Sequence, residues 1–295
     1  MLEHLATEQR NEKTKHLDEM ETREILRVMN KEDQAAVIAV SKQLDCIEKV
    51  VQLVIAAFRR GGRLIYVGAG TSGRLGLLDA VECPPTFGTE PSMVQAVLAG
   101  GLRAVVKAVE GAEDDEEAAV RDLQAVGLTK NDVVIGIAAS GRTPYVVGAL
   151  RYAKQIGAST GSIACNKGAV ISQYADAAVE IETGPEVLTG STRLKAGTAQ
   201  KMVLNMISTA SMVGIGKVYG NWMVDVQATN EKLKERAKRI ITETTGVSAE
   251  EASYYYEQAN GEVKTAIVMI LRQCDYEEAK ERLQQAEGFV RKALE

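Results

Sequence analysis

Short apolar runs alternate along this chain with longer stretches in which apolar residues recur at every third or fourth position. A short apolar run bounded by glycine or polar residues predicts a buried strand, and the longer spacing predicts an amphipathic helix. The predicted strands are residues 64–67, 93–98, 133–137, 162–165 and 178–181. The predicted helices in the same region are residues 31–60, 75–81, 114–125, 144–157 and 197–213.

Local signals refine the ends of two predicted helices. Asn30 is a suitable N-cap for the helix over 31–60, and Asp33 follows three residues later. Cys83-Pro84-Pro85 is expected to end the helix that starts near residue 75, because proline has no backbone N–H group.

The order of these elements predicts the fold class. Strands alternate with helices from about residue 64 to residue 215, which is typical of an α/β protein with a parallel sheet and helices on both faces. Residues 230–295 have only helical patterns, with a capping box at Ser248 and Glu251 and a turn at Asn260-Gly261. Three short helices are expected there as a small all-α bundle. We therefore divide the chain into an N-terminal helical segment (1–50), an α/β domain (51–220) and a C-terminal helical domain (221–295).

The loop after the first predicted strand reads GAGTSGRLG, residues 68–76. Gly68, Gly70 and Gly73 match the dinucleotide fingerprint, but no acidic residue follows the second strand to bind a ribose, and no Gly-Lys-Ser/Thr is present. Two hydroxyl groups at the start of a helix suit a smaller anion, because the first N–H groups of a helix attract negative charge. In parallel sheets the ligand lies beyond the carboxyl ends of the strands, where the strand order reverses.

A second turn of the same kind follows the third predicted strand, at Ser140-Gly141-Arg142-Thr143. For either turn alone, helix capping by Ser and Thr is the simpler interpretation. Together the two turns predict a cradle for a small phosphate monoester. The predicted substrate-binding residues are Gly70, Thr71, Ser72, Ser140, Gly141, Arg142 and Thr143. Arg193 and Lys195 are further candidates that could equally pair with surface acids.

Composition narrows the chemistry. The 295 residues carry a net charge of −5, which argues against nucleic-acid binding, and no apolar stretch approaches the roughly 20 residues of a spanning helix. The N-terminus is polar and mixed in charge, so the cytoplasm is the expected location. Four scattered cysteines form no CxxC pair, and the only histidines, His4 and His16, lie in the N-terminal leader. We expect no metal and no cofactor, and acid–base chemistry by Glu, Asp, Lys, Tyr or Cys unless the leader folds over the site.

Two carboxylates are candidates for that chemistry. Glu82 follows a predicted helix between Val81 and Cys83, where the helix dipole and apolar neighbours favour the protonated form that a general acid needs. An exposed loop glutamate is the simpler alternative. Glu113 precedes the acidic run 114–117, whose acids complement a helix N-terminus. Spacing alone does not distinguish Glu113 from these neighbours.

The sequence resembles the bacterial N-acetylmuramic acid 6-phosphate etherases over nearly its whole length. The resemblance rests on the strings TEQRN, YVGAGTSGRLGLLDAVECPPTFG, VEGAEDDEE, VVIGIAASGRTPYV, GSTRLKAGTAQKMVLNMIST and VDVQATNEKL. The one difference noted is Val81, where the family often has Ser. The resemblance implies a sugar isomerase (SIS) domain with a five-stranded parallel sheet, a C-terminal part similar to a ubiquitin-associated domain, a homodimer and no metal.

The resemblance also implies a reaction and a pair of catalytic residues. The lactyl ether of N-acetylmuramic acid 6-phosphate would be cleaved to N-acetylglucosamine 6-phosphate and D-lactate, with Glu82 as proton donor and Glu113 as the second carboxylate. Two alternatives share the fold. A non-enzymatic sugar-phosphate sensor, like the glucokinase regulatory protein, needs the pocket without the acid, and a sugar-phosphate isomerase needs only the base at C2. Neither alternative releases lactate.

Overall fold

The computed structural model describes residues 5–226 and 231–295. The chain folds into two compact units. Unit 1 consists of Met1–Val81 and Ser92–Ser208, and unit 2 consists of Glu82–Pro91 and Thr209–Glu295. The domain bounds that we derived from the sequence stay a prediction.

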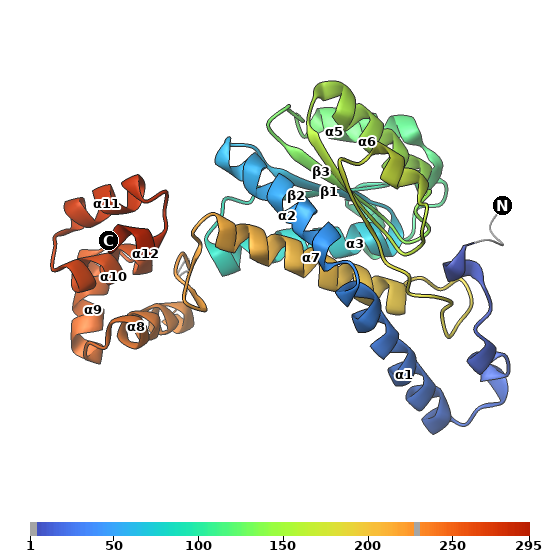
Figure 1. Cartoon of the computed structure of the whole chain (residues 1–295), viewed down its shortest axis with the longest axis horizontal. Helices are drawn as coiled ribbons and strands as arrows, with labels where there is room; N and C mark the ends of the chain where they lie inside the picture. Colours follow the sequence, from blue (N-terminus) through green and yellow to red (C-terminus); the bar gives the residue numbers. More distant parts are fainter. Residues whose placement is uncertain (1–4, 227–230) are drawn as a thin grey trace. The chain divides into compact units, whose positions relative to one another are not determined.

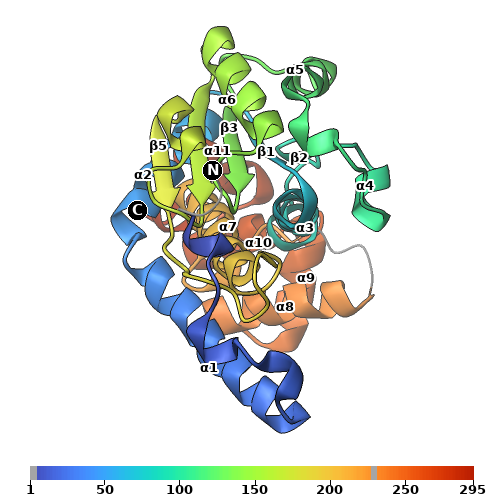
Figure 2. The same ribbon diagram turned by 90° about the vertical axis from the view of Figure 1, so that its right-hand side faces the viewer.

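Unit 1 contains a five-stranded parallel sheet, as the sequence predicts. The strands are β1 (Leu64–Gly68), β2 (Val94–Leu98), β3 (Val133–Ala138), β4 (Ser159–Ala164) and β5 (Ala177–Glu180). Their order in the sheet is β2-β1-β3-β4-β5, and every neighbouring pair is parallel (Figure 2). The chain leaves β1 toward β2 and then returns to the other side of β1 for β3, so the strand order reverses between β1 and β3.

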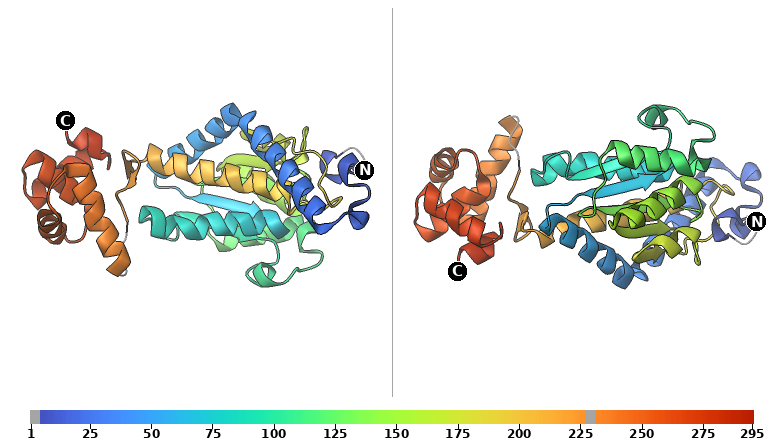
Figure 3. Two further views of the ribbon diagram at one scale, coloured as in Figure 1. Left: turned by 90° about the horizontal axis from the view of Figure 1, so that it is seen from below. Right: turned by 90° about the horizontal axis from the view of Figure 1, so that it is seen from above.

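Helices cover both faces of this sheet (Figures 1 and 3). On one face lie α5 (Glu116–Ala125) and α6 (Pro144–Ile156), and on the other lie α2 (Leu44–Arg59), α3 (Gly70–Phe87) and α7 (Lys195–Gly214). The alternation of side chains along β1 produces these two layers. Ile65 and Val67 join the apolar cluster with α5 and α6, whereas Tyr66 points the other way and donates a hydrogen bond to Asp79 on α3 at 2.9 Å.

The remaining elements of unit 1 are short or lie at its N-terminal end. Helix α1 (Thr22–Ser41) precedes α2, and α4 (Arg103–Val106) follows β2. Single 3-10 turns occur at η2 (Ala6–Glu8), η3 (Glu12–Thr14), η4 (Leu17–Glu19), η5 (Ala112–Asp114) and η6 (Val170–Tyr174).

The single helix predicted over 31–60 is wrong in its bounds. The structure has two helices, α1 and α2, separated where Gln43 adopts φ −112° and ψ 9°. Helix α1 begins eight residues earlier than Asn30, with a reciprocal capping box between Glu21 and Glu24, so Asn30 lies inside the helix and is not its N-cap. The apolar spacing continues across the break between the two helices, and periodicity alone therefore does not reveal it.

The predicted break at Cys83-Pro84-Pro85 is also wrong, because α3 starts at Gly70 and continues through both prolines to Phe87. The prolines lack only the N–H groups that would bond to the carbonyls of Ala80 and Val81. Each proline therefore removes one hydrogen bond, and α3 continues for only two more residues to Phe87. The N–H of Gly88 then donates to the Pro84 carbonyl at 2.9 Å and ends the helix.

Unit 2 is mainly helical, as expected, but with more helices than three. It contains the antiparallel pair β6 (Val218–Tyr219) and β7 (Trp222–Met223), followed by α8 (Glu231–Thr245), α9 (Ala249–Gln258), α10 (Val263–Arg272), α11 (Tyr276–Gln285) and α12 (Val290–Ala293). The helices enclose a separate apolar core that includes Ile240, Ile267 and Leu283. The capping box between Ser248 and Glu251 is confirmed at the start of α9.

Candidate functional site

The two hydroxyl-bearing turns follow neighbouring strands. β1 and β3 pair directly, with Gly68 opposite Ile137, and both strands point toward the same edge of the sheet. Gly70–Ser72 and Ser140–Thr143 therefore leave the sheet side by side, at the carboxyl edge and on either side of the point where the strand order reverses. This is where ligands bind in open parallel sheets.

Close packing of α3 against the sheet shapes the first turn. A Cβ atom at Gly73 would lie 2.5 Å from the carbonyl oxygen of Gly68 and 2.2 Å from Cδ1 of Leu98, so a side chain has no room there. Gly70 has φ +53°, a conformation that favours glycine. The buried hydroxyl of Ser72 donates to Oε1 of Gln200 on α7 at 3.0 Å.

Hydrogen bonds from the next strand shape the second turn. The carbonyl of Ala139, just before the turn, accepts from the N–H of Cys165 at 2.9 Å and from Nδ2 of Asn166 at 3.0 Å. Thr143 occupies the N-cap position of α6, but its side chain makes no capping hydrogen bond. Helix capping thus does not account for the Thr143 hydroxyl. The exposed Arg142 donates its backbone N–H to Ser140 Oγ at 3.4 Å.

A cavity of about 240 Å³ adjoins the first turn and places Glu113 next to it. Its wall is formed by the turn, the end of β2 and the segment after α4, with the lining residues Ala69, Gly70, Arg74, Ala99, Ala104, Ala108, Val109, Glu110, Gly111, Ala112 and Glu113. Arg74 Nε donates to the carbonyl of Ala104 at 3.0 Å and holds this segment against α3. The carboxylate of Glu113 is exposed on the same cavity as Gly70.

Glu82 is not among the residues that line this cavity. It is exposed on α3, twelve residues after Gly70. At 1.5 Å per residue that separation is roughly 18 Å along the helix. The structure thus brings Glu113 to the first turn and leaves Glu82 on a different part of α3.

The N-terminal leader contacts Asn166, the residue that binds the Ala139 carbonyl before the second turn. Asn166 Oδ1 accepts from the backbone N–H of Thr7 at 3.3 Å, and Asn166 Nδ2 donates to Thr7 Oγ1 at 3.0 Å. Both residues are buried. His16 is exposed and pairs with Glu19 at 3.4 Å, and His4 lies outside the described residues.

A buried ion pair joins the leader, α1 and the start of α7. Lys195 Nζ contacts Glu32 at 2.8 Å, and Asn11 and Lys13 donate to the same carboxylate at 2.9 and 2.6 Å. Burial by itself would raise the pKa of Glu32, but the hydrogen bonds from Lys13 and Lys195 outweigh it and lower that pKa to about 2. Lys195 therefore pairs with a buried acid. The exposed Arg193 lines a cavity of about 200 Å³ together with Glu32 and Lys195.

Gln200, Asn166 and Glu32 are not among the residues that the sequence predicts for the site. Each forms hydrogen bonds with residues far away in the chain. Gln200, for example, accepts a hydrogen bond from Ser72, 128 positions away. Gln200 lies within GTAQK, a string that carries the family resemblance, and this is the only signal that marked its neighbourhood.

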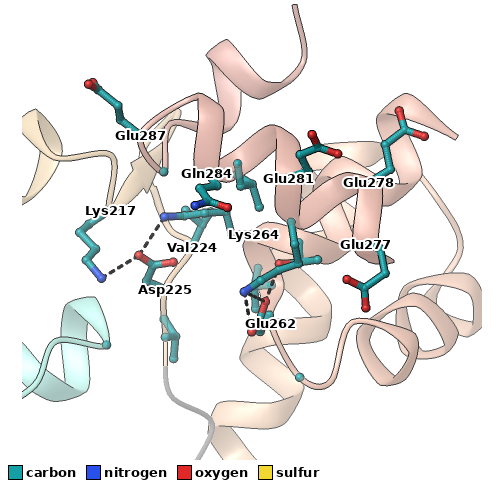
Figure 4. Close-up of a pocket in the computed structure, with 18 residues that line it drawn as sticks. Lys217, Val224, Asp225, Glu262, Lys264, Glu277, Glu278, Glu281, Gln284 and Glu287 are labelled. Carbon is teal, nitrogen blue, oxygen red and sulfur yellow. Dashed lines mark hydrogen bonds and ion pairs between the residues drawn. The ribbon is translucent and has the colours of Figure 1, made fainter. Parts of the chain in front are cut away.

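A larger cavity of about 1110 Å³ lies in unit 2 (Figure 4). Lys217 and Lys264 both contact Asp225, at 3.0 and 2.9 Å, and Lys280 contacts Glu262 at 2.9 Å. Burial lowers the pKa of Lys264, although Asp225 opposes this effect. None of the residues that we predicted for the site lines this cavity.

Within residues 5–226 and 231–295, no group of three or more His, Cys, Asp or Glu side chains could hold a metal ion. The four cysteines are free, and burial raises the pKa of the Cys165 thiol, which keeps it protonated. In the same part of the chain, no helix has the length and apolar character needed to cross a membrane. The absence of metal and cofactor stays a prediction.

Curated relatives match the chain from end to end. It is 93% identical over 295 residues to the N-acetylmuramic acid 6-phosphate etherase of Geobacillus thermodenitrificans, covering 100% of both chains. It is 67% identical over 294 residues to the protein of that name from Bacillus anthracis, again covering 100% of both chains. This chain belongs to the N-acetylmuramic acid 6-phosphate etherase family.

Domain profiles agree with this etherase family. Residues 45–154 match the glucokinase regulatory protein N-terminal SIS domain, and residues 109–210 match the SIS domain. A phosphoheptose isomerase structure from Francisella tularensis is 13% identical, with a TM-score of 0.49, and covers 66% of this chain and 100% of that chain. The corresponding isomerase from Neisseria gonorrhoeae is 16% identical, with a TM-score of 0.47, and covers 64% of this chain and 97% of that chain. These structural likenesses are weak, and no functional inference follows from them.

Proposed function

We propose that this chain cleaves the D-lactyl ether of N-acetylmuramic acid 6-phosphate and yields N-acetylglucosamine 6-phosphate and D-lactate, in the recycling of cell-wall amino sugars. The full-length relative at 93% identity bears the name of that etherase. The observation that carries the proposal is the pair of hydroxyl-bearing turns on the adjacent strands β1 and β3, with Glu113 on the cavity at the first turn.

The reaction needs an acid and a base but no redox step. Opening of the sugar ring exposes an aldehyde at C1, which acidifies the proton on C2. A base removes this proton, the C2 electrons form a double bond to C3, and the C3–O bond breaks as an acid protonates the departing lactate oxygen. Water then adds to the unsaturated aldehyde at C3 and returns a proton to C2. Two carboxyl groups with different pKa values are sufficient for these transfers.

The two turns and the cavity beside the first of them suit part of this scheme. Gly70, Thr71 and Ser72 from one turn and Ser140, Gly141, Arg142 and Thr143 from the other would hold the 6-phosphate. This anchor is remote from the reacting carbons and therefore orients C2 and C3 without taking part in bond breaking. Glu113 is our candidate for the base at C2, since it shares a cavity with Gly70.

Glu82 is our candidate for the acid, and its position favours a homodimer. It lies about three helical turns beyond Gly70, which is too far to reach a sugar held at the turn of its own chain. Two neighbouring apolar side chains on α3, Leu78 and Val81, are exposed by 50% and 54%, as expected for a face that another subunit covers. We propose that Glu82 of the partner subunit completes each site, and sedimentation of a species twice the 31.8 kDa chain would support this.

The decisive experiment incubates the protein with N-acetylmuramic acid 6-phosphate, with EDTA present, and assays D-lactate. The wild type should release D-lactate, and Glu82→Gln should lower kcat by about 10²–10⁴-fold, the usual contribution of a general acid, with KM little changed. Glu90→Gln, which changes another exposed glutamate nearby in the chain, serves as the matched control. No D-lactate from the wild type would favour a sensor or an isomerase, and an unchanged rate in Glu82→Gln would remove Glu82 from the mechanism.

A further inference from the structure

Gln200 has a buried amide with one half unsatisfied. The residue lies on α7 with no exposed surface, and its Oε1 accepts the hydrogen bond from Ser72 Oγ at 3.0 Å. Its Nε2 atom is also buried but has no hydrogen-bond partner. Buried N–H donors in folded proteins are nearly always paired, so this orphan requires an explanation.

The orphan lies against the first hydroxyl-bearing turn. One helical turn before Gln200, a Cβ atom added at Gly197 would lie 3.5 Å from Cγ2 of Thr71. The starts of α7 and α3 are therefore in direct contact, and the two helices run side by side across the sheet (Figure 3). Gln200 thus reaches the proposed phosphate site through Ser72 and not from solvent.

The hydroxyl of Ser72 has a single proton and can also accept hydrogen bonds. In the described structure this proton is directed at Gln200 Oε1, so Ser72 has none to donate to a phosphate oxygen. Rotation of the amide by 180° exchanges Nε2 and Oε1 with almost no change in shape. Nε2 would then donate to Ser72 Oγ, and the Ser72 proton would be free to turn toward an anion.

We propose that Gln200 is a positioning residue for the phosphate group, and that it acts by setting the direction of the Ser72 proton. With the amide in the orientation described, Oε1 holds that proton; with the amide rotated, Nε2 donates to Ser72 and Ser72 donates to the phosphate. The orphaned donor is then paired, and a carbonyl oxygen, which tolerates being unpaired better than an N–H group, takes its place. This inference rests on the proposed function only in placing the phosphate at the first turn.

The test is a double-mutant cycle with Gln200→Met and Ser72→Ala. Gln200→Met keeps the length of the side chain but removes both hydrogen-bonding atoms. We expect it to raise KM for N-acetylmuramic acid 6-phosphate, and the inhibition constant of inorganic phosphate, by about tenfold, with kcat within about twofold. In the Ser72→Ala background the same change should add less than about twofold, because Gln200 then has no hydroxyl to orient.

Ser211→Ala is the matched control, because Ser211 is another fully buried residue of α7 with an unpartnered polar atom. It should leave both constants unchanged. Equal KM in wild type and Gln200→Met, or effects that multiply fully in the double variant, would overturn the inference. If Gln200→Met does not fold, Gln200→Leu takes its place: it also lacks both hydrogen-bonding atoms and adds no charge, so it should weaken phosphate binding by the same factor.

Phosphate binding measured by calorimetry separates this inference from the proposed function. If the wild type binds inorganic phosphate but releases no D-lactate, the proposed function fails and the role of Gln200 is still measured by phosphate affinity. If D-lactate is released and Gln200→Met binds phosphate as tightly as the wild type, the role of Gln200 fails alone.

Discussion

The two hydroxyl-bearing turns at the carboxyl edge of the sheet have the same place in the fold but are held by different means. The first turn is held by steric fit, since Gly73 packs on the backbone of Gly68 and on Leu98. The second turn is held by hydrogen bonds, since Asn166 binds both the Ala139 carbonyl and the leader at Thr7. Almost any side chain at Gly73 would disturb the first turn. The hydrogen bonds that hold the second turn can instead be removed one at a time.

The difference extends to the hydroxyl groups themselves. In the first turn, the Ser72 proton is already engaged by Gln200, so a ligand must exchange one hydrogen bond for another. In the second turn, the Thr143 side chain makes no capping hydrogen bond. Thr143 therefore has no capping bond to give up when it binds a ligand. We expect the first turn to be the more demanding of the two toward its anion, because its donor must be released before it can bind.

The largest effect is expected for Gly73→Ala. The new Cβ would lie 2.5 Å from the Gly68 carbonyl oxygen, and a backbone atom cannot move aside as a side chain can. We expect a loss of about 3 kcal/mol in the free energy of unfolding, measured by urea denaturation. Gly197→Ala is the control, since its Cβ would make ordinary contacts at 3.5 Å and should not destabilise. Equal stability of the two variants would show that the first turn is not held by steric fit.

A smaller effect is expected for Asn166→Ala. The change leaves the buried N–H and hydroxyl of Thr7 without partners and removes one of the two donors to Ala139. We expect a loss of about 2 kcal/mol in the free energy of unfolding, and a higher KM because the second turn is less well placed. Asn131→Ala, at an exposed asparagine, should change neither quantity measurably. A stable Asn166→Ala with normal KM would contradict the hydrogen-bonded support.

Acid is also expected to destabilise the protein, because it acts through Glu32 on the start of α7 and on the N-terminal leader. This carboxylate holds Lys195 at the start of α7 and Asn11 in the leader. Its pKa is lowered from 4.5 to about 2 on folding, so its contribution to stability is fully present above pH 4.5 and is lost as pH falls toward 2. Unfolding measured across this range should be less steeply pH-dependent in Glu32→Gln than in the wild type. Glu48→Gln, at an exposed position, should retain the steep dependence.

Much of the fold could be predicted from local patterns, and the exceptions have physical causes. All five strands were placed within a few residues, because a buried strand of a parallel sheet is a short apolar run whatever its neighbours are. The apolar spacing over 31–60 is unbroken across Gln43, so it predicts one helix where the structure has α1 and α2. The prolines at 84 and 85 do not end α3, because each removes a single hydrogen bond and its fixed φ still fits a helix, which continues to Phe87.

The candidate site was predicted less completely. Its glycines and hydroxyls stand together in the sequence, so the turns were recognisable, and Glu113 was named only through the family resemblance. The sequence does not predict Gln200 or Asn166 as site residues. Each is a single amide side chain without a motif around it, Gln200 within a helix and Asn166 just after a strand. Nothing in their local sequence shows which distant atom they meet.

The strands, the family and the two turns can be read from the sequence, because these depend on neighbours within a few positions of the chain. The pairing of β1 with β3, the contact of Ser72 with Gln200 across 128 positions and that of Thr7 with Asn166 across 159 emerge only in the folded chain. This is because a hydrogen bond depends on distances of about 3 Å between atoms. Such distances are set by how helices and strands pack together, and the order of residues encodes them only through the complete fold.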